Sequence, residues 1–497
     1  MGGKPYPPSM MSKGRSVILL AVFFSAFFLN AYNNDFKLGY HPDEPKKVRF
    51  IETNTQDFQH PILMLQVVRA ANYFADFTDK QAIAALGRTV IATFGAATAV
   101  LCYLLSRAAL RGSSAYVVAA LAATSPILIT HSHYLKEDII LTFFCLLSLL
   151  LLLRYIRVRD SLSLVGLGIA TGLAMSSHYK GVLLFVVYLL SPVLVPIKDR
   201  RRYFKGLITC ALIAIFTFLV VNYPIFLHPK VFNRGISFDL RHIFRGHGSS
   251  KHAIKIYATS ELFGFHLVNS IVPGITLAVT LLALAFLVAT LLRWKQSSWR
   301  DKILVVYVLL FYLVVEVSPT KPFPDFMRYV IPVIPVLLYF SVRGVEMVAD
   351  CLRFVGAKRT FAALVAVALS LPLCESLRLI RDLGEDTREK AERLIAENHW
   401  QTKCETYAAL RADVWSLSTL NIQAERDNGV THLVASSFLY DRFIHGKSLK
   451  NQGEAVYEAY QRYGELFSRP FIEITPPYKS FAFHNPTIRI IDIREIE

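Results

Sequence analysis

Long apolar runs separated by short polar segments make up the first three quarters of the chain. A helix that crosses a membrane needs about 20 mainly apolar residues. Runs of this kind lie at 16–32, 88–110, 114–130, 138–156, 161–177, 180–197, 205–224, 264–292, 303–318, 326–343 and 360–377. The pattern therefore predicts a polytopic α-helical membrane domain over residues 1–378, with about eleven transmembrane helices.

The hydrophobic pattern changes near residue 379. Residues 382–398 have the pattern of a charged amphipathic helix. Residues 431–437 and 487–493 are typical of short strands, and residues 451–468 between them favour a helix. These elements predict a soluble α/β domain over residues 379–497, which is an ordinary size for a domain.

Basic residues predict how the helices are oriented. When the N-terminus is placed inside, every inner loop carries Arg or Lys, including Arg107, Arg154, Lys198, Arg293 and Arg343. Cytoplasmic loops of membrane proteins show this bias. The first outer loop at 33–87, the second at 225–263 and the C-terminal domain are therefore expected on the extracytoplasmic side.

Composition narrows the class of protein further. The chain is 54% hydrophobic, yet its formal net charge is +17. The basic clusters punctuate apolar runs and do not form stripes on soluble elements, which excludes a nucleic-acid partner and leaves membrane lipids as expected partners. Six cysteines are scattered without ligand spacing, so neither a disulfide framework nor a zinc site is indicated.

The segment 39–61 carries the densest candidate chemistry. Asp43 and Glu44 are adjacent, and His41 and two prolines frame them. Proline disfavours regular helix, so both acids are expected on an irregular loop at the membrane surface. A carboxylate in such a place serves as a general base or a metal ligand, and the alternative is a pair of solvated loop acids.

Two further outer segments carry a membrane-surface pattern. Residues 62–74 have the pattern of an amphipathic helix that lies along the membrane interface. The loop 225–263 is rich in His, Arg and Lys, but the spacing matches no set of metal ligands. A solvated loop near anionic headgroups is the favoured interpretation of that second loop.

Polar residues also gather at the predicted outer ends of the spans. They are Arg88, which opens the second span; His131, His133, Tyr134, Lys136, Glu137 and Asp138 between the third and fourth; His178, Tyr179 and Lys180; Asn222, Tyr223 and Pro224; Lys321; and Arg328 and Tyr329. A charge near hydrocarbon is costly and usually functional. Acids supply a base or metal ligands, whereas cations hold a phosphate. Taken singly, each cation also fits an interface anchor.

The ordered series of these motifs resembles a known family. After the Asp-Glu pair and His-Pro come LGRTVIATFGAATAVLCYLLSR, SHYLKEDIILTFFCLLSLLLLLR, GLAMSSHYKGVLLF, NYP and RYVIPVIPVLLYF. Together they resemble the GT-C glycosyltransferases, in particular the protein-mannosyltransferase-like and aminoarabinose-transferase-like group of glycosyltransferase family 39. The resemblance covers residues 16–345 and extends through DTREKAERLIAEN and FHNPTIRI into the C-terminal domain.

The resemblance implies a membrane enzyme that moves a sugar from a polyprenyl-phosphate or dolichyl-phosphate carrier to an acceptor on the outer side. It implies Asp43 as the general base, with Glu44 and Asp138 as further catalytic acids. Arg88, Lys180 and Arg328, with Tyr134 and Lys136, are the implied ligands of the donor phosphate. His60, at the family's His-Pro position, and His133 and His178 are expected to shape the site or bind a divalent metal. Ile62 and His178 depart from the common family pattern.

Direct displacement from such a carrier inverts the anomeric centre. Metal use, the sugar and the acceptor stay open, and the acceptor is a protein, lipid A, another envelope glycan or a glycolipid. A transporter or flippase would show inverted repeats, which the sequence lacks. A non-catalytic scaffold, or an oligosaccharide transferase with a pyrophosphate-linked donor, is a further alternative. The absence of cysteine pairs favours a bacterial inner membrane.

Overall fold

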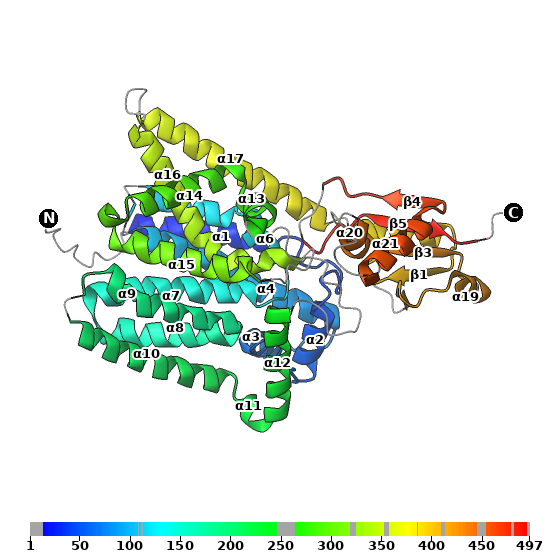
Figure 1. Cartoon of the computed structure of the whole chain (residues 1–497), viewed down its shortest axis with the longest axis horizontal. Coiled ribbons are helices and arrows are strands. Elements are labelled where there is room, and N and C mark those ends of the chain that lie inside the picture. The colour runs from blue at the N-terminus through cyan, green and yellow to red at the C-terminus, as the bar shows by residue number, and fades with distance from the viewer. Residues whose placement is uncertain are drawn as a thin grey trace.

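The computed structural model describes residues 13–494 except 108, 111–112, 198, 246–263, 319–324, 352–356, 385, 409–412, 445–453 and 479–481. A bundle of long helices forms one part of the molecule, and a small α/β domain adjoins one end of it (Figure 1). The first described helix begins at the other end of the bundle.

Nine long helices form most of the bundle in the described residues. They are α1 (Lys13–Ala31), α4 (Lys80–Ser106), α7 (Asp138–Val158), α8 (Ser161–Ser177), α10 (Arg200–Val221), α14 (Leu277–Leu292), α15 (Trp299–Glu316), α16 (Ile334–Cys351) and α17 (Ala357–Leu383). Shorter segments connect or extend them: α5 (Ser114–Ala123), α6 (Pro126–Ser132), η1 (Tyr179–Leu183), α9 (Leu184–Leu194), η2 (Leu267–Ile271), α13 (Val272–Ile275), η3 (Trp294–Gln296) and η4 (Asp325–Val333).

Helix length and composition identify fewer spans than the sequence pattern predicts. In the described part of the chain, five helices are long and apolar enough to cross a membrane, or up to seven if each bent pair is one span. Three more apolar helices are shorter, with 10–17 residues. The membrane-protein class is as expected, whereas the number of about eleven spans stays a prediction.

Two predicted straight spans are bent. The run 264–292 forms two segments, Leu267–Ile275 and Leu277–Leu292, at 113° to each other. The run 114–130 bends by 48° between α5 and α6. There Ser125 is extended because it precedes Pro126, and a residue before proline is disfavoured in the helical conformation.

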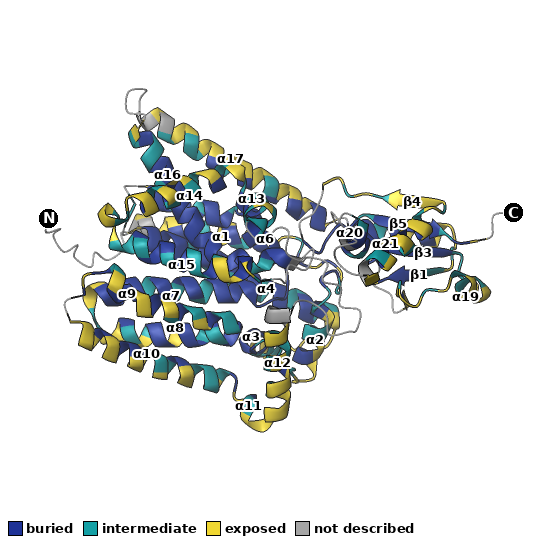
Figure 2. Cartoon of the chain, viewed as in Figure 1, coloured by how far each residue is buried: buried dark blue, intermediate teal, exposed yellow. Residues whose placement is uncertain are grey.

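Many exposed residues on the outer helices of the bundle are large and apolar, as contact with lipid requires, and Figure 2 shows where the exposed positions lie. In the hydrophobic stretch of α10 only 22% of residues are buried, whereas 89% are buried in the stretch that begins at Phe326 and includes α16. Because α10 exposes Ile208 and Leu212, each at 63%, it lies at the lipid-facing edge, and α16 lies in the core.

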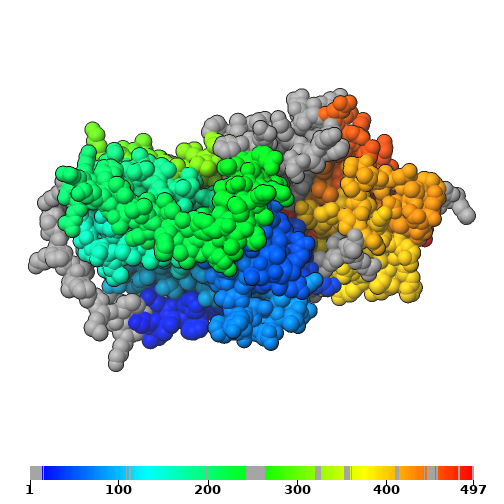
Figure 3. Space-filling model, turned by 90° about the horizontal axis from the view of Figure 1, so that it is seen from below, coloured from blue at the N-terminus to red at the C-terminus, as the bar shows by residue number. Residues whose placement is uncertain are grey.

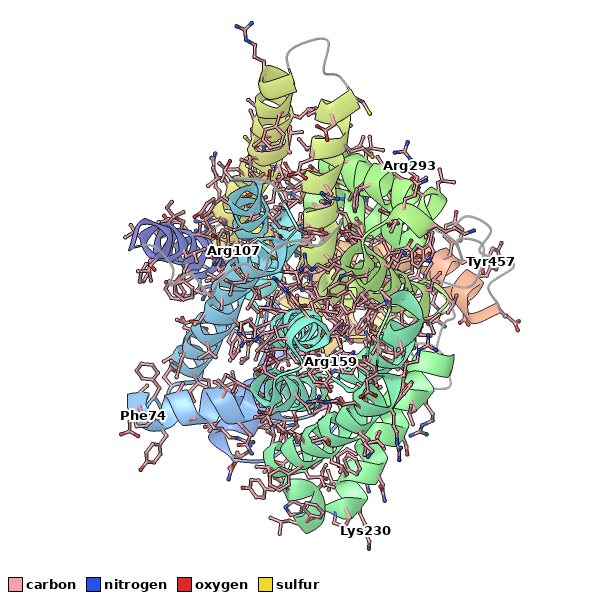
Figure 4. The ribbon with its side chains drawn as sticks, turned by 90° about the vertical axis from the view of Figure 1, so that its left-hand side faces the viewer. Phe74, Arg107, Arg159, Lys230, Arg293 and Tyr457 are labelled. Carbon is pink, nitrogen blue, oxygen red and sulfur yellow. The ribbon has the colours of Figure 1, made fainter. Side chains whose placement is uncertain are left out.

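Four helices lie at the end of the bundle nearest the α/β domain: α2 (Glu44–Glu52), α3 (Leu63–Ala75), α11 (Pro224–Leu227) and α12 (Pro229–Arg245) (Figure 1). Helix α3 matches the amphipathic helix predicted at 62–74, since it buries Met64 and exposes Tyr73 and Phe74. Arg107 and Arg159 follow the ends of α4 and α7 remote from the first outer loop, and Figure 4 views the bundle from that end.

The prediction that both acids lie on an irregular loop is wrong for Glu44, which lies in a helix. Asp43 occupies the N-cap position of α2, and Glu44 is the first helical residue. Pro45 lies in the first turn, where its missing N–H has no helical partner to lose, so proline starts this helix instead of preventing it.

The C-terminal domain contains a mixed five-stranded sheet in the order β2-β1-β3-β5-β4. The strands are β1 (Thr402–Glu405), β2 (Val414–Trp415), β3 (His432–Ser436), β4 (Phe471–Ile474) and β5 (Ile488–Asp492), and the helices are α18 (Thr387–Glu397), α19 (Ile422–Asp427), α20 (Ser437–Ile444) and α21 (Glu454–Phe467). Strands β3 and β5 and helix α21 lie within the elements that the sequence predicts. The predicted helix 382–398 is divided, because α17 continues to Leu383 and α18 begins at Thr387.

Candidate active site

Asp43 lies at the edge of a buried polar cluster between the helical bundle and the C-terminal domain. Its carboxylate accepts a hydrogen bond from Lys136 Nζ at 2.5 Å. The side chain of Asp43 is 46% exposed, whereas that of Lys136 is 1% exposed. The backbone N–H of Asp43 donates to His41 Nδ1 at 3.2 Å. Asp43 is therefore a carboxylate that the protein holds in place but leaves accessible from outside.

The charge of Asp43 is stabilised by its neighbours. Desolvation acts to raise the pKa of its carboxyl, but Lys136, His41 and Arg328, in decreasing order of effect, outweigh it. The pKa of Asp43 is consequently well below its ordinary value. With no substrate bound, this carboxyl is ionised throughout the physiological pH range.

Glu137 connects three basic side chains of the cluster, although the sequence placed it only among the polar residues at the span ends and assigned it no catalytic or phosphate-binding role. It accepts from Lys47 Nζ at 3.3 Å, lies 3.1 Å from His60 Nε2 and 3.6 Å from Lys136 Nζ, and is 1% exposed. Burial acts to raise the pKa of Glu137, but His60, Lys136 and Lys47 together hold it well below its usual value. The run Lys136-Glu137-Asp138 before an apolar helix was the available sequence signal.

Lys180 and Arg328 approach the same cluster from two other helical segments. The ring of Tyr329 lies 4.1 Å from Lys180 Nζ and 5.2 Å from the guanidinium carbon of Arg328. Arg328 also lowers the pKa values of Asp43 and Glu137, which places its positive charge near both acids. The structure thus gathers three predicted phosphate ligands, those two and Lys136.

His178 and His60 lie side by side in this region, with ring centroids 5.0 Å apart. His178 Nδ1 accepts from the backbone N–H of Lys180 at 3.2 Å, so the histidine orients the segment that carries the lysine. Among the described residues, no group of three or more His, Cys, Asp or Glu side chains is arranged to hold a metal ion.

Arg88 and Glu44 form a buried, bidentate ion pair. Contrary to expectation, they bind each other and do not face the polar cluster around Asp43. Arg88 Nε donates to Glu44 Oε1 at 3.0 Å and Nη2 to Oε2 at 2.5 Å, and both side chains are 0% exposed. Arg88 Nη1 donates to the carbonyls of Asn34 and Phe36 at 2.9 and 2.6 Å. Since Arg88 lies within α4 and not at its start, its donors serve the protein, and this corrects its predicted role in phosphate binding.

Tyr134 and His133 are also placed differently from the prediction. Tyr134 is fully buried, and its hydroxyl lies 2.6 Å from His484 Nδ1. The two ring nitrogens of His133 lie 2.8 and 2.9 Å from the carbonyl oxygens of Ile129 and Tyr32. These contacts occupy the polar atoms of both side chains, so neither residue is available to a phosphate or a metal.

Asp138 is the first residue of α7 and is 4% exposed. Its Oδ2 atom is buried without a hydrogen-bond partner among the described residues. A buried carboxylate oxygen without a partner is costly, because desolvation is not compensated. This oxygen, one residue from Glu137, is therefore available to a ligand hydroxyl.

The C-terminal domain touches the first outer loop directly behind Asp43. The ring of His41 lies 4.6 Å from Phe483 and 4.9 Å from Tyr134. Arg388 stacks on Tyr40 at 4.1 Å and donates to its carbonyl at 3.3 Å. The sequence indicated no role for this domain, whereas the structure makes it part of the wall that supports the loop.

Helix α12 covers the first outer loop from the other side, and its green surface adjoins the blue surface of that loop in Figure 3. A Cβ atom at Gly235 would clash with the carbonyl oxygen of Asp57, so the two backbones are in close contact. The solvated second loop expected at 225–263 is therefore a packed helix up to Arg245, and residues 246–263 lie outside the described residues.

Asp239 lies on α12, in the segment where the sequence predicts a solvated loop. Burial raises the pKa of its carboxyl to about 6, against the lowering effects of Lys180 and Arg328. Because the folded-state pKa exceeds the unfolded one, Asp239 binds its proton more tightly in the folded protein. Its stabilising contribution is complete below pH ~4 and is lost as the pH rises through about 6.

We expect Asp239→Asn to remove this pH dependence. The melting temperature of the variant should exceed that of the wild type at pH 7.5, and the difference should shrink as the pH falls toward 4.5. Thermal unfolding of the detergent-purified proteins across this range measures the effect. A difference that stays constant with pH would contradict the assigned titration.

This arrangement of a helical bundle and a small α/β domain is similar to that of two solved proteins, and a family model matches part of the chain. A family model described as dolichyl-phosphate-mannose-protein mannosyltransferase matches residues 67–236. The crystal structure of ArnT from Cupriavidus metallidurans bound to undecaprenyl phosphate superimposes with a TM-score of 0.53 at 12% identity, covering 96% of this chain and 98% of that chain. The Archaeoglobus fulgidus oligosaccharyltransferase in the apo form gives 0.57 at 14% identity, covering 85% and 69%.

No curated protein sequence matches the chain. The structural matches at this low identity establish the fold, and the family model independently matches residues 67–236, about a third of the chain. The predicted resemblance to the GT-C glycosyltransferases is confirmed, and the chain is an integral membrane protein of that fold.

Proposed function

We propose that the chain transfers a sugar from a polyprenyl-phosphate or dolichyl-phosphate carrier to an acceptor on the extracytoplasmic side of the membrane. The observation that carries this proposal is the accessible Asp43 carboxylate paired with buried Lys136. The description of the matching family names a dolichyl-phosphate-mannose donor, and the ArnT structure holds undecaprenyl phosphate. Both support a lipid-phosphate carrier as the donor.

Lys136, Lys180 and Arg328 would bind the phosphate of the donor. Charge-assisted hydrogen bonds to a phosphate are among the strongest that proteins form. Preorganised positive charge also stabilises the phosphate as it leaves, since negative charge develops on its bridging oxygen in the transition state. The proposal assigns this neutralisation to the three cations, and metal use stays open.

Asp43 would act as the general base. An acceptor hydroxyl gives its proton to the Asp43 carboxylate while its oxygen attacks the anomeric carbon. The bond from that carbon to the phosphate oxygen breaks, and its electron pair leaves with the phosphate. This direct displacement inverts the anomeric configuration. When the donor phosphate attracts Lys136, the pKa of Asp43 rises toward its usual range, which makes the carboxylate a stronger base.

The other acids would support this reaction. Glu137 holds Lys136 and His60 in place through its ion pairs. The partnerless Oδ2 of Asp138 would accept a hydrogen bond from a hydroxyl of the donor sugar. Glu44, predicted as a catalytic acid, would instead keep α2 in position through its pair with Arg88.

The membrane arrangement that follows is also a proposal. Residues 1–378 would form the catalytic membrane domain and residues 379–497 an extracytoplasmic domain. The N-terminus would lie in the cytoplasm, and a bacterial inner membrane is the proposed location. Accessibility of single cysteines, introduced at Lys46 and at Arg159, to a membrane-impermeant thiol reagent tests the sidedness, because only the first should react in intact cells.

The transfer reaction is tested with the purified protein, a panel of labelled sugars on polyprenyl phosphate, and envelope extracts as acceptors. A labelled product is expected with at least one donor, and its anomeric configuration should be opposite to that of the donor. Retained configuration would overturn the role of Asp43 as a base toward the acceptor. Donor binding without any product would favour a transporter or a scaffold.

Removal of one phosphate-binding cation should act on donor affinity. We expect Lys180→Gln to raise KM for the donor about tenfold or more, because a hydrogen bond to a charged group contributes about 1.5–3 kcal/mol. Lys46→Gln is the matched control, since Lys46 pairs with Asp57 and Gln59 at the surface of the first loop. Steady-state kinetics at varied donor concentration measures both. Equal KM values in the two variants would remove Lys180 from the donor site.

A further inference from the structure

A hollow lies between the outer end of α1 and the first part of α4, away from the residues of the proposed active site. It is an open groove of about 670 Å³. Its lining includes Phe24, Phe27, Phe28, Tyr32, Ala85 and Thr89. The small side chain of Ala85 leaves room opposite the aromatic residues of α1, so apolar side chains form most of the wall in this part of the groove.

The apolar part of the groove faces the hydrocarbon of the membrane. Phe24 and Phe28 are 62% and 61% exposed on α1, an apolar helix of this membrane fold. In Figure 3 the deep-blue surface of α1 and the lighter blue surface that follows the first outer loop lie side by side at one edge of the molecule. A ligand of this groove reaches it from the lipid phase, so it must carry a hydrocarbon chain.

The outer end of the groove is polar and incomplete. Asn34 lines it, is 8% exposed, and both its Oδ1 and its Nδ2 are buried without a hydrogen-bond partner among the described residues. Asn33 takes a left-handed conformation with φ of 60° just after α1, and this turn directs the chain inward at Asn34. A buried amide without partners is unfavourable, because it has lost its water without compensation. A ligand that both accepts and donates hydrogen bonds would satisfy it.

We propose that this groove binds one membrane glycerophospholipid with a primary amine headgroup. One acyl chain would lie along the aromatic residues of α1. The ester and phosphodiester oxygens would accept from Asn34 Nδ2, and the ammonium group of the headgroup would donate to Asn34 Oδ1. Asp35 is exposed at the polar rim, so a headgroup that ends in an ammonium group is favoured over one that is only anionic. The site does not depend on the transfer reaction proposed above.

The bound lipid would support the first outer loop. The backbone carbonyl of Asn34 accepts from Arg88 Nη1 at 2.9 Å, and Arg88 in turn binds Glu44 at the start of α2. A lipid that holds Asn34 in place therefore also holds the backbone carbonyl that binds Arg88. Arg88 in turn positions α2, the helix that follows Asp43. This gives the groove a positioning role for the loop without any contact with the reacting groups.

Native mass spectrometry of the detergent-purified protein tests the proposal, with phosphatidylethanolamine and phosphatidylglycerol added separately. The wild type should retain one phosphatidylethanolamine per chain and about tenfold less phosphatidylglycerol. Ala85→Trp should lose this retention, because the indole fills the groove. The matched control is Val193→Trp, which places the same side chain at a position that is 80% exposed on α9.

A second measurement covers the case in which Ala85→Trp fails to fold. The melting temperature of the wild type should rise when phosphatidylethanolamine is added, whereas that of Asn34→Leu should not, since leucine removes the amide but keeps the backbone carbonyl. Equal retention by the wild type and Ala85→Trp would mean that only unspecific boundary lipid binds, and would overturn the proposal. Equal retention of the two lipids would overturn the headgroup assignment.

Discussion

Asp43→Asn should lower the rate of sugar transfer by about 10²–10⁴-fold, the usual contribution of a general base. Asparagine has nearly the same shape but accepts no proton at neutral pH. Lys136 would lose the negative charge of its 2.5 Å partner but keep its 3.6 Å contact with Glu137, so the buried ammonium retains a neighbouring negative charge. The loss of rate should therefore appear mainly in kcat and much less in donor binding.

The measurement is initial-rate transfer under saturating donor, with donor binding and thermal unfolding recorded on the same preparations. Glu52→Gln is the matched control, because Glu52 lies on the same helix, and its only recorded ion pair among the described residues is a 3.9 Å contact with Lys80. The control should transfer sugar at the wild-type rate. A fully folded Asp43→Asn variant within tenfold of the wild-type rate would rule out the proposed base.

Arg88→Met should destabilise the protein by about 3–5 kcal/mol, because it leaves the Glu44 carboxylate buried without its cation. Both side chains are 0% exposed, and the guanidinium also lies 3.6 Å from the ring of Phe36. Glu44 would keep only the backbone N–H of Leu135 at 3.0 Å as a donor that the structure records. The single substitution therefore removes most of the compensation for burial of this charge.

The double variant Arg88→Met/Glu44→Gln is the decisive comparison. If the two residues form a structural clamp, removal of both charges should cost less than Arg88→Met alone, since no unpaired charge stays buried. Thermal or denaturant unfolding of the three proteins measures the coupling. A stable Arg88→Met variant that binds donor weakly would instead restore the phosphate-binding role that the sequence resemblance implied.

Much of the active-site inventory was predictable from the sequence. Asp43, Lys136, Lys180 and Arg328 lie at the same end of the bundle, as expected from the ends of the apolar runs. The physical reason is that a charge is costly in hydrocarbon, so the boundaries of the spans place charged side chains at the membrane surface. The interfacial helix α3 was predictable for the same reason, because its apolar positions recur with the helical period.

The pairing of these charges was not predictable. Glu44 and Arg88 are 44 residues apart, and Asp43 and Lys136 are 93 apart, so their contacts depend on how the helices pack. The two adjacent acids differ in exposure: Asp43 stays accessible at the N-cap of α2, and Glu44 is buried against Arg88. Local sequence cannot show which of the two acids is buried, because neighbouring residues at a helix start point in different directions.

The sequence alone determined that this is a helical membrane protein with a small sheet after the bundle, because apolar run length and strand pattern are local properties. Only the tertiary structure decided the bends at 125 and 276, the central position of Glu137, and the contacts of Phe483 with His41 and of His484 with Tyr134. Those features arise from packing between distant segments, where buried polar groups must find partners that the chain supplies from far away.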